Sequence, residues 1–282
     1  MENLTKKILV IMLLLFINNV LSQEKTIKGI VLDSLNNPIK YASIGLVNRP
    51  IGTVTNNKGE FKLEINKPSI TDTLKISSIG FKSKIFIIQN ISNNLTINLD
   101  ENVEELEEVV IVSSNKLKNL KKGKEKTKTN KELFFVVPKM KNINLGVELG
   151  RKFKIGNKPS KLSEFKFFVK KNNFKKIKFK INIYTIKKNK PYQRINKEDI
   201  IVDIPNKKTG WIASNLNQYD IKTKENIIIT IQWIYASEEG DILSLPIFAP
   251  TFSSTHYYKQ SSQTKWRKYR FISSSMFLKY KQ

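Results

Sequence analysis

The stretch GTVTNNKGEFKLEI, residues 52–65, sets five polar residues between two apolar runs. Asparagine tolerates left-handed backbone dihedrals, and glycine adopts positive φ at no steric cost, so residues 55–59 predict a tight turn between two strands. A calcium-binding loop would need carboxylates at alternating positions, which this segment does not supply. We therefore expect a hairpin turn here and not a ligand site.

Short β-like runs separated by turn residues continue on both sides of this turn. Their approximate positions are 26–33, 41–47, 53–55, 60–65, 72–81, 82–88, 95–100 and 106–113. No ten-residue stretch here has a convincing helical period, so helix content should be low. About seven strands in this length predict a small antiparallel β-sandwich.

The same region carries groups of motif residues in a fixed order. They are Gly29-x-Val31-x-Asp33, Asn37-Pro38-Ile39, Tyr41-Ala42-Ser43-Ile44, Gly52-Thr53-x-Thr55-Asn56-x-x-Gly59-x-Phe61 and Leu74-x-Ile76-Ser77-x-Ile79-Gly80-Phe81. Over residues 25–100 they resemble the carboxypeptidase-regulatory-like domain of exported Bacteroidetes-type proteins. The resemblance implies a transthyretin-like, seven-stranded β-sandwich for residues 23–113. The family's usual Asp after the turn Thr is Asn56 here, so the resemblance carries over no cation site.

The N-terminus has the pattern of a secretory signal peptide over residues 1–22. Lys6 and Lys7 precede an apolar run from Ile8 to Ile17, and Ser22 is a small residue before a possible cleavage point. The run is shorter than the roughly 18 apolar residues that span a bilayer. We expect export to the periplasm, the outer membrane or the cell surface, with no transmembrane helix in the mature chain. Because Cys is absent, the domains must be stable without disulfides.

The charge balance is strongly basic, with 50 Lys and Arg against 24 Asp and Glu and a net charge of +26. Such a charge attracts anionic partners. Base and phosphate recognition favours the bidentate guanidinium of Arg, yet only five of the 50 cations are Arg. We therefore expect an envelope glycan, lipopolysaccharide or an outer-membrane protein as the partner, and no nucleic acid.

Residues 114–132 contain eight Lys and almost nothing apolar, which predicts an extended linker. Residues 133–282 again show β-like runs, and their number favours a jelly-roll-like β-sandwich. In 164–171 and 176–186 apolar residues alternate with Lys. If these two segments pair through a turn at Asn172 and Asn173, their Lys form a basic ladder on a solvent face, available for anionic surfaces. The ladder consists of Lys166, Lys170, Lys176, Lys178 and Lys180.

The residues for most catalytic chemistry are missing. His256 is the single histidine, so neither a zinc carboxypeptidase site nor a Cys–His pair is possible, and we expect His256 in a surface loop. No phosphate-binding or dinucleotide glycine pattern occurs, so no cofactor is expected. A glycoside hydrolase-like enzyme would need two facing carboxylates. The carboxylates considered for that role are Glu164, Glu198, Asp199, Asp203, Asp220, Glu225, Glu238, Glu239 and Asp241.

Exposed aromatic rings give sugars an apolar platform, which leaves Trp211, Trp266, Tyr257 and Tyr258 as possible ligand-binding residues. Trp233 lies in a continuous apolar face and is expected in the core. The interpretation that these observations favour is a non-enzymatic exported binding or scaffolding protein of the cell envelope. A carbohydrate-binding protein that uses the exposed aromatics is the first alternative, and the carboxylate-based enzyme is the second.

Overall fold

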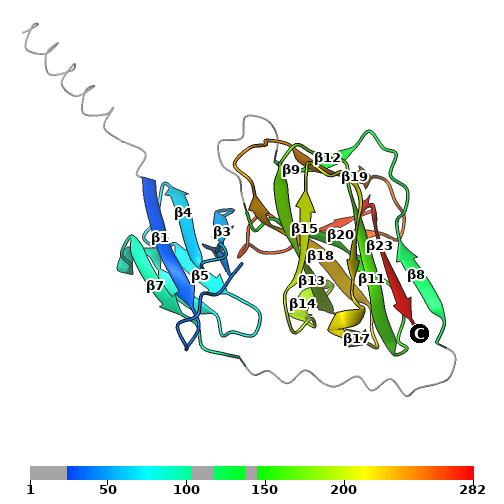
Figure 1. Cartoon of the computed structure of the whole chain (residues 1–282), viewed down its shortest axis with the longest axis horizontal. Coiled ribbons are helices and arrows are strands. Elements are labelled where there is room, and N and C mark those ends of the chain that lie inside the picture. The colour runs from blue at the N-terminus through cyan, green and yellow to red at the C-terminus, as the bar shows by residue number, and fades with distance from the viewer. Residues whose placement is uncertain (1–23, 103–116, 137–144) are drawn as a thin grey trace, which may run out of the picture.

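The computed structural model describes residues 24–102, 117–136 and 145–282, which form two β-domains (Figure 1). The predicted signal peptide and the predicted strand at 106–113 lie outside the described residues. Helical structure in the described part is confined to two single 3₁₀ turns, Ile88–Asn90 and Asn217–Tyr219. The expectation of an all-β protein with low helix content is confirmed.

The N-terminal domain is a sandwich of two sheets. One has the order β4-β1-β7 and the other β3-β2-β5-β6. The strands are β1 (Glu24–Leu32), β2 (Ser43–Leu46), β3 (Gly52–Val54), β4 (Glu60–Asn66), β5 (Thr73–Ser77), β6 (Lys84–Ile87) and β7 (Asn94–Asn98). All pairs are antiparallel, as predicted, except β1 with β7, which is parallel. Between the sheets Ile27, Ile44 and Leu74 are fully buried.

Residues 55–59 form the predicted turn, but it does not close a hairpin. β3 before the turn pairs with β2, whereas β4 after it pairs with β1 in the other sheet. The Asn56 side-chain oxygen accepts hydrogen bonds from the backbone N–H of Lys58 at 2.8 Å and of Glu60 at 3.0 Å. The turn could therefore be predicted from its local sequence. The change of sheet could not, because it depends on strands that are distant in the sequence.

Thr55 and Gly59 fix this turn against the β1–β2 loop. The buried Thr55 hydroxyl donates to the Ile39 carbonyl at 2.7 Å and accepts from the Ala42 N–H at 2.8 Å. Gly59 has a φ of 75°, and a Cβ there would lie 2.7 Å from the Val31 carbonyl oxygen. Only glycine combines that dihedral with so close an approach.

The second domain is a larger sandwich of three sheets. The first has the order β14-β13-β18-β10-β20-β21, with β15 also on β13. The second has the order β16-β11-β23-β8, with β17 on β11, and the third has the order β12-β19-β22, with β9 on β19. The strands are β8 (Asn119–Gly123), β9 (Glu132–Val136), β10 (Glu148–Phe153), β11 (Ser160–Val169), β12 (Lys171–Asn172), β13 (Lys176–Lys187), β14 (Lys190–Arg194), β15 (Ile200–Pro205), β16 (Gly210–Asn215), β17 (Lys222–Thr223), β18 (Ile227–Ala236), β19 (Leu243–Phe248), β20 (Thr255–Lys259), β21 (Arg267–Arg270), β22 (Ser273–Ser274) and β23 (Met276–Lys281).

One apolar core fills the space between these sheets. The Phe167 ring of β11 meets the Phe179 ring of β13 at a centroid distance of 5.4 Å, which joins the first two sheets. Trp233 is fully buried in the same core, as expected, and packs edge-on against Phe135 and Phe174. We call the side of β13 and β18 that points into this core the core face.

The predicted linker over 114–132 is wrong for much of its length. Asn119–Gly123 form β8, which pairs antiparallel with the C-terminal strand β23, and Glu132 begins β9. The Thr129 hydroxyl also donates to the Ile247 carbonyl at 3.0 Å. The Lys-rich segment joins the sheet here because the edge of β23 is otherwise unpaired within the described residues. β23 is far from this segment in the sequence, so the pairing could not be predicted from local residues.

The predicted lysine ladder is also wrong. β11 pairs with β16 and β23, and β13 pairs with β15, β14 and β18, so the two segments lie in different sheets. Lys166 and Lys170 therefore do not share a face with Lys176, Lys178 and Lys180. Lys166 forms an ion pair with Glu164 at 3.4 Å, and Lys170 one with Glu132 at 3.1 Å. Alternation predicts a strand and its two faces, but not its neighbour.

Candidate functional site at the domain junction

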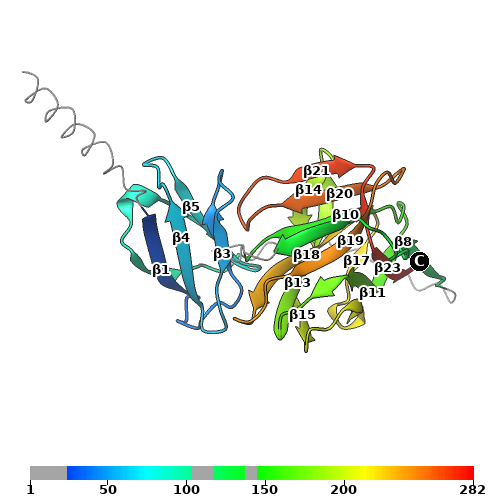
Figure 2. The same cartoon turned by 90° about the horizontal axis from the view of Figure 1, so that it is seen from above.

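The side of β13 and β18 opposite the core face is partly covered by the N-terminal domain, whose strand β3 lies nearest to it (Figure 2). We call it the junction face. Lys180 of β13 donates from Nζ to the Tyr41 carbonyl at 3.0 Å, and the Gln232 amide of β18 donates to Ser43 Oγ at 3.2 Å. Beside these contacts Tyr41, Val54 and Ile234 form a small buried apolar cluster.

A second set of contacts comes from the loop between β20 and β21. The Gln263 side-chain amide donates to the Ser43 carbonyl at 3.0 Å and to Ser77 Oγ at 2.8 Å. Ser262 donates from Oγ to the Thr53 carbonyl at 3.0 Å. Polar side chains of the second domain thus bind the backbone of β2 and β3.

The turn at residues 55–59 positions the N-terminal domain's side of this junction. Tyr41 has a φ of 54°, uncommon for a non-glycine residue, and its hydroxyl donates to Asn57 Oδ1 at 2.6 Å. The turn thereby holds the Tyr41 ring, and the Tyr41 carbonyl is left to accept from Lys180. Asn57 thus helps to position the domain contact.

Lys180 is the charged group at the centre of the junction. Its side chain is only 2% exposed, and Nζ lies 3.0 Å from Asp199 Oδ2. Burial lowers the pKa of Lys180, and the neighbouring Asp199 opposes that shift. A buried ammonium needs such partners, because removal from water is costly for an unpaired charge.

Glu148, which we did not consider from the sequence, lies on the same face and is 1% exposed. Its Oε1 accepts hydrogen bonds from Asn182 Nδ2 at 2.7 Å, from the Tyr184 hydroxyl at 2.9 Å and from the Thr230 hydroxyl. Burial, followed by the charge of Glu148, raises the pKa of Tyr184 well above its usual range. Three donors from two strands therefore hold Glu148 as a fixed acceptor.

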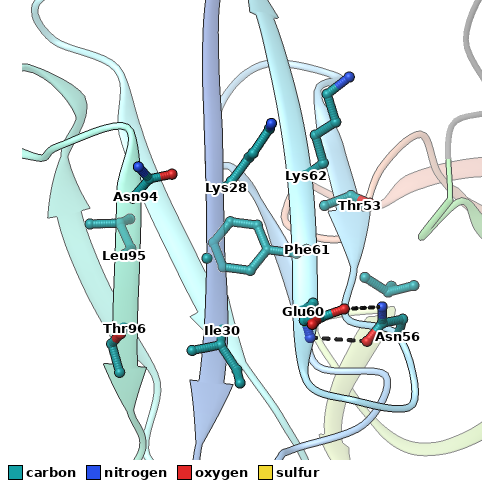
Figure 3. A pocket seen from close by; sticks show the side chains of 12 residues that line it. Lys28, Ile30, Thr53, Asn56, Glu60, Phe61, Lys62, Asn94, Leu95 and Thr96 are labelled. Atoms are coloured by element: carbon teal, nitrogen blue, oxygen red, sulfur yellow. Dashed lines mark hydrogen bonds between the residues drawn. The ribbon is translucent and has the colours of Figure 1, made fainter.

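An open depression of about 820 Å³ lies on the N-terminal domain, beside the turn at residues 55–59 (Figure 3). We call it the basin. It extends from β3 over β4 and β1 to β7, and Lys28 and Lys62 project from its upper part in the view shown. The carboxylate of Glu60 in its wall accepts from Asn56 Nδ2 at 2.9 Å. Exposed ammonium, amide and hydroxyl groups suit this surface to a polar or anionic ligand.

The possible sugar-binding aromatics do not converge. Trp211 of β16 packs edge-on against Phe168 and Phe277 in the second sheet. Trp266, in the first sheet's β20–β21 loop, packs against Tyr184, and Tyr257 of β20 is buried in the same cluster. Tyr258 packs against the main core. These rings stabilise two separate sheets and form no shared platform.

His256 is buried on β20 and does not lie in a surface loop, so that prediction is wrong. Its Nε2 lies 3.1 Å from Ser274 Oγ, and Arg151 on the neighbouring β10 is its register partner. Burial, with a smaller contribution from Arg151, lowers the pKa of His256 to about 3. The imidazole is therefore neutral at physiological pH. Its polar pattern STHYYK gave no sign that Ser274 of β22, in another sheet, would contact its side chain.

Four of the nine carboxylates considered for catalysis, Glu164, Asp199, Asp203 and Asp220, form ion pairs with Lys side chains. Asp203 pairs with Lys178, Asp220 with Lys161 and Lys222, and Glu164 with Lys279 as well as Lys166. Within the described residues, no group of three or more His, Cys, Asp or Glu side chains could hold a metal ion. In the same part of the chain, no helix has the length and apolarity to cross a membrane.

The N-terminal domain matches a known family. Residues 27–111 match the model of the CarboxypepD_reg-like domain, which confirms the resemblance carried by the sequence motifs. No curated protein matches the chain.

Several solved structures are weakly similar. The cysteine protease and lectin-like domains of Cwp84, a surface layer associated protein of Clostridium difficile, align at 12% identity over 48% of this chain and 32% of that chain, with a TM-score of 0.37. The structure of infectious bursal disease virus Gx strain aligns at 8% identity over 92% and 56%, with a TM-score of 0.31. BcpA, the major pilin subunit of Bacillus cereus, aligns at 8% identity over 89% and 69%, with a TM-score of 0.20.

Proposed function

We propose that this chain, whose residues 27–111 match the carboxypeptidase-regulatory-like family, is an exported, non-catalytic binding or scaffolding protein of the cell envelope. The junction is the observation that carries the proposal. Its buried polar groups, Glu148 and Lys180 among them, are engaged in joining strands and domains. Groups held in this way serve to fix one domain on the other.

The basin is the surface that we propose for ligand binding. It lies next to the junction and shares Val54, Asn56 and Glu60 with a depression of about 320 Å³ that also reaches Ile234 of the second domain. A ligand in the basin would therefore contact a domain whose orientation is already fixed. The exposed Lys28, together with Lys62, which forms an exposed ion pair with Glu64 at 2.6 Å, favours an anionic group, such as those of envelope glycans or lipopolysaccharide.

Capture of envelope components from a membrane extract by the full mature chain tests this proposal. The variant K28E/K62E reverses the charge of both basin lysines, and K207E/K208E makes the same change in net charge on an exposed turn of the second domain. We expect the basin variant to lose most of the captured material and the control to retain it. Equal capture by both variants and the wild type would exclude the basin.

The location is tested separately, by fractionation of the native cells. We expect the protein in the periplasmic or outer-membrane fraction, with residues 1–22 absent from the mature N-terminus. Recovery of the intact chain in the cytoplasm would contradict the export part of the proposal.

A further inference from the structure

Two phenylalanines project together from the second domain into solvent. Phe252 is 81% exposed and Phe271 is 52% exposed, and their ring centroids are 6.1 Å apart. They come from different loops, before β20 and after β21. We call this pair the aromatic tip. Exposed neighbouring Phe rings are unusual on a water-facing surface, because each leaves a large apolar area in contact with water.

Backbone hydrogen bonds hold the two loops of the tip together. The Thr251 N–H donates to the Phe271 carbonyl at 2.7 Å, and the Phe271 N–H donates to the Ser254 carbonyl at 3.0 Å. Phe271 has a φ of 60°, which a bulky residue rarely adopts. The conformation of the tip is thus held by backbone hydrogen bonds, and the left-handed φ of Phe271 carries a conformational cost.

Basic residues lie near the tip, and Glu125, the carboxylate between Lys124 and Lys126, forms an ion pair with Lys121 at 2.8 Å. From Ile242 to Gln282 the chain contains seven Lys and Arg and neither Asp nor Glu, and Arg270 directly precedes Phe271. The Lys131 ammonium donates to the Ala249 carbonyl at 2.9 Å, in the loop that leads to Phe252. Lys124 and Lys126 lie over the Phe248 ring, at 4.9 and 6.0 Å from its centroid, and Phe248 pairs with Ser273. Lys124, Lys126 and Lys131 of the Lys-rich segment 114–132 thus place positive charge near the tip.

The tip also lies away from the domain junction. One end of the β20–β21 hairpin, at Ser262 and Gln263, contacts the N-terminal domain. The aromatic tip lies at the opposite end, and β21 runs toward it away from the N-terminal domain (Figure 2). The tip can therefore meet a surface while the junction stays closed.

We infer that the aromatic tip docks on the surface of an anionic phospholipid bilayer. Phe252 and Phe271 would enter the boundary between headgroups and acyl chains, while Lys124, Lys126, Lys131 and Arg270 would meet the lipid phosphates. Apolar insertion combined with basic residues is the usual chemistry of peripheral attachment. This inference goes beyond the proposed ligand binding, since it uses a different surface and different residues.

Sedimentation with lipid vesicles tests the inference, using the full mature chain. Vesicles of phosphatidylcholine and phosphatidylglycerol in equal amounts are compared with vesicles of phosphatidylcholine alone. We expect the wild type to bind the anionic vesicles, the variant F252S/F271S to bind at least tenfold more weakly, and K126Q/R270Q to bind more weakly at low salt. The control L35S/I70S removes two exposed apolar residues of the N-terminal domain, 77% and 70% exposed, and should bind as the wild type does.

Three results would overturn the inference. They are failure of the wild type to bind anionic vesicles, unchanged binding by F252S/F271S, and an equal loss in the L35S/I70S control.

Sedimentation velocity tests for a different occupant of the tip. If the wild type self-associates without lipid and F252S/F271S does not, the tip binds a second copy of the chain. Because both tip side chains are exposed, we expect F252S/F271S to unfold at the wild-type temperature. It should also capture the basin ligand normally, which separates this test from that of the proposed function.

Discussion

In the middle of β13 both faces are buried, and they differ in chemistry. On the core face Ile177, Phe179 and Ile181 contact other apolar side chains and are fully buried. On the junction face Lys180 and Asn182 are equally buried, and each has specific hydrogen-bond partners. The core face is stabilised by area removed from water, and the junction face by satisfied polar groups.

This difference matters for function, because apolar packing tolerates many similar sequences whereas a polar contact requires its particular partner. The junction face therefore specifies which domain covers it and in what orientation. The core face requires only that some apolar surface covers it.

The largest effect should come from the core face. Replacement of Phe179 by Ala would leave a cavity beside Phe135 and Phe167, and should lower the free energy of unfolding by about 3–5 kcal/mol. Denaturant melts measure the change. Tyr235 on the neighbouring β18 is partly exposed, and Tyr235→Ala should cost less than half as much; equal costs would mean that the two sites are packed alike.

On the junction face, Lys180→Met should cost about 2 kcal/mol. The substitution leaves Asp199 without its cation and the Tyr41 carbonyl without its donor, and Asp199 is 27% exposed, so the loss is smaller than for a fully buried pair. Lys176→Met, on the exposed end of the same strand, is the matched control and should change stability little. If K180M/D199N were as unstable as the sum of its single variants, the pair would have no coupling.

His256 is a polar exception among the inward-facing groups of the same sheet, and it predicts a pH dependence. Because the folded pKa of about 3 lies below the ordinary 6.5, the unfolded chain binds the proton first as the pH falls. Stability should decrease from about pH 6.5 downward, approaching about 1.4 kcal/mol per pH unit from this group. His256→Gln should remove that part of the slope, so parallel profiles for the two proteins between pH 6 and pH 4 would contradict the assignment.

The smallest effect is expected where the junction face reaches solvent. The Lys178 ammonium lies over the Tyr41 ring, 5.7 Å from its centroid, and 3.1 Å from Asp203, whose side chain is 51% exposed. Water screens such a pair, so Lys178→Ala should cost less than about 1 kcal/mol. Thermal melts at low and high salt measure it; a cost equal to that of Lys180→Met would show that the junction extends further than described.

The sequence predicted those features that depend on near neighbours. The turn at residues 55–59 follows from asparagine and glycine backbone preferences, and the core faces of β11 and β13 follow from alternation. Trp233 was placed in the core by the same rule. The family of the N-terminal domain was also identifiable, because its motifs are spaced along one continuous segment.

The features that the sequence missed depend on strands far apart. Nothing in the alternation of β13 shows that its polar side is covered by another domain, so Lys180 was expected in solvent. Asn119–Gly123 contain a single apolar residue, Leu120, and form a strand because β23, at the other end of the domain, pairs with them. Glu148 drew no attention because its three donors come from β13 and β18. One sign was available, since Glu148 stands between Val147 and Leu149, and an acidic residue between two apolar ones is unusual in a buried strand.

Amine labelling of the unmodified full chain tests most directly whether the N-terminal domain seals the junction face. An acetylating reagent at low dose, followed by peptide mass spectrometry, compares Lys180 with Lys176 on the same strand and with Lys62, which is 57% exposed. A sealed junction predicts that Lys180 is labelled far more slowly than both, by at least tenfold. Labelling of Lys180 at the rate of Lys176 and Lys62 would contradict it.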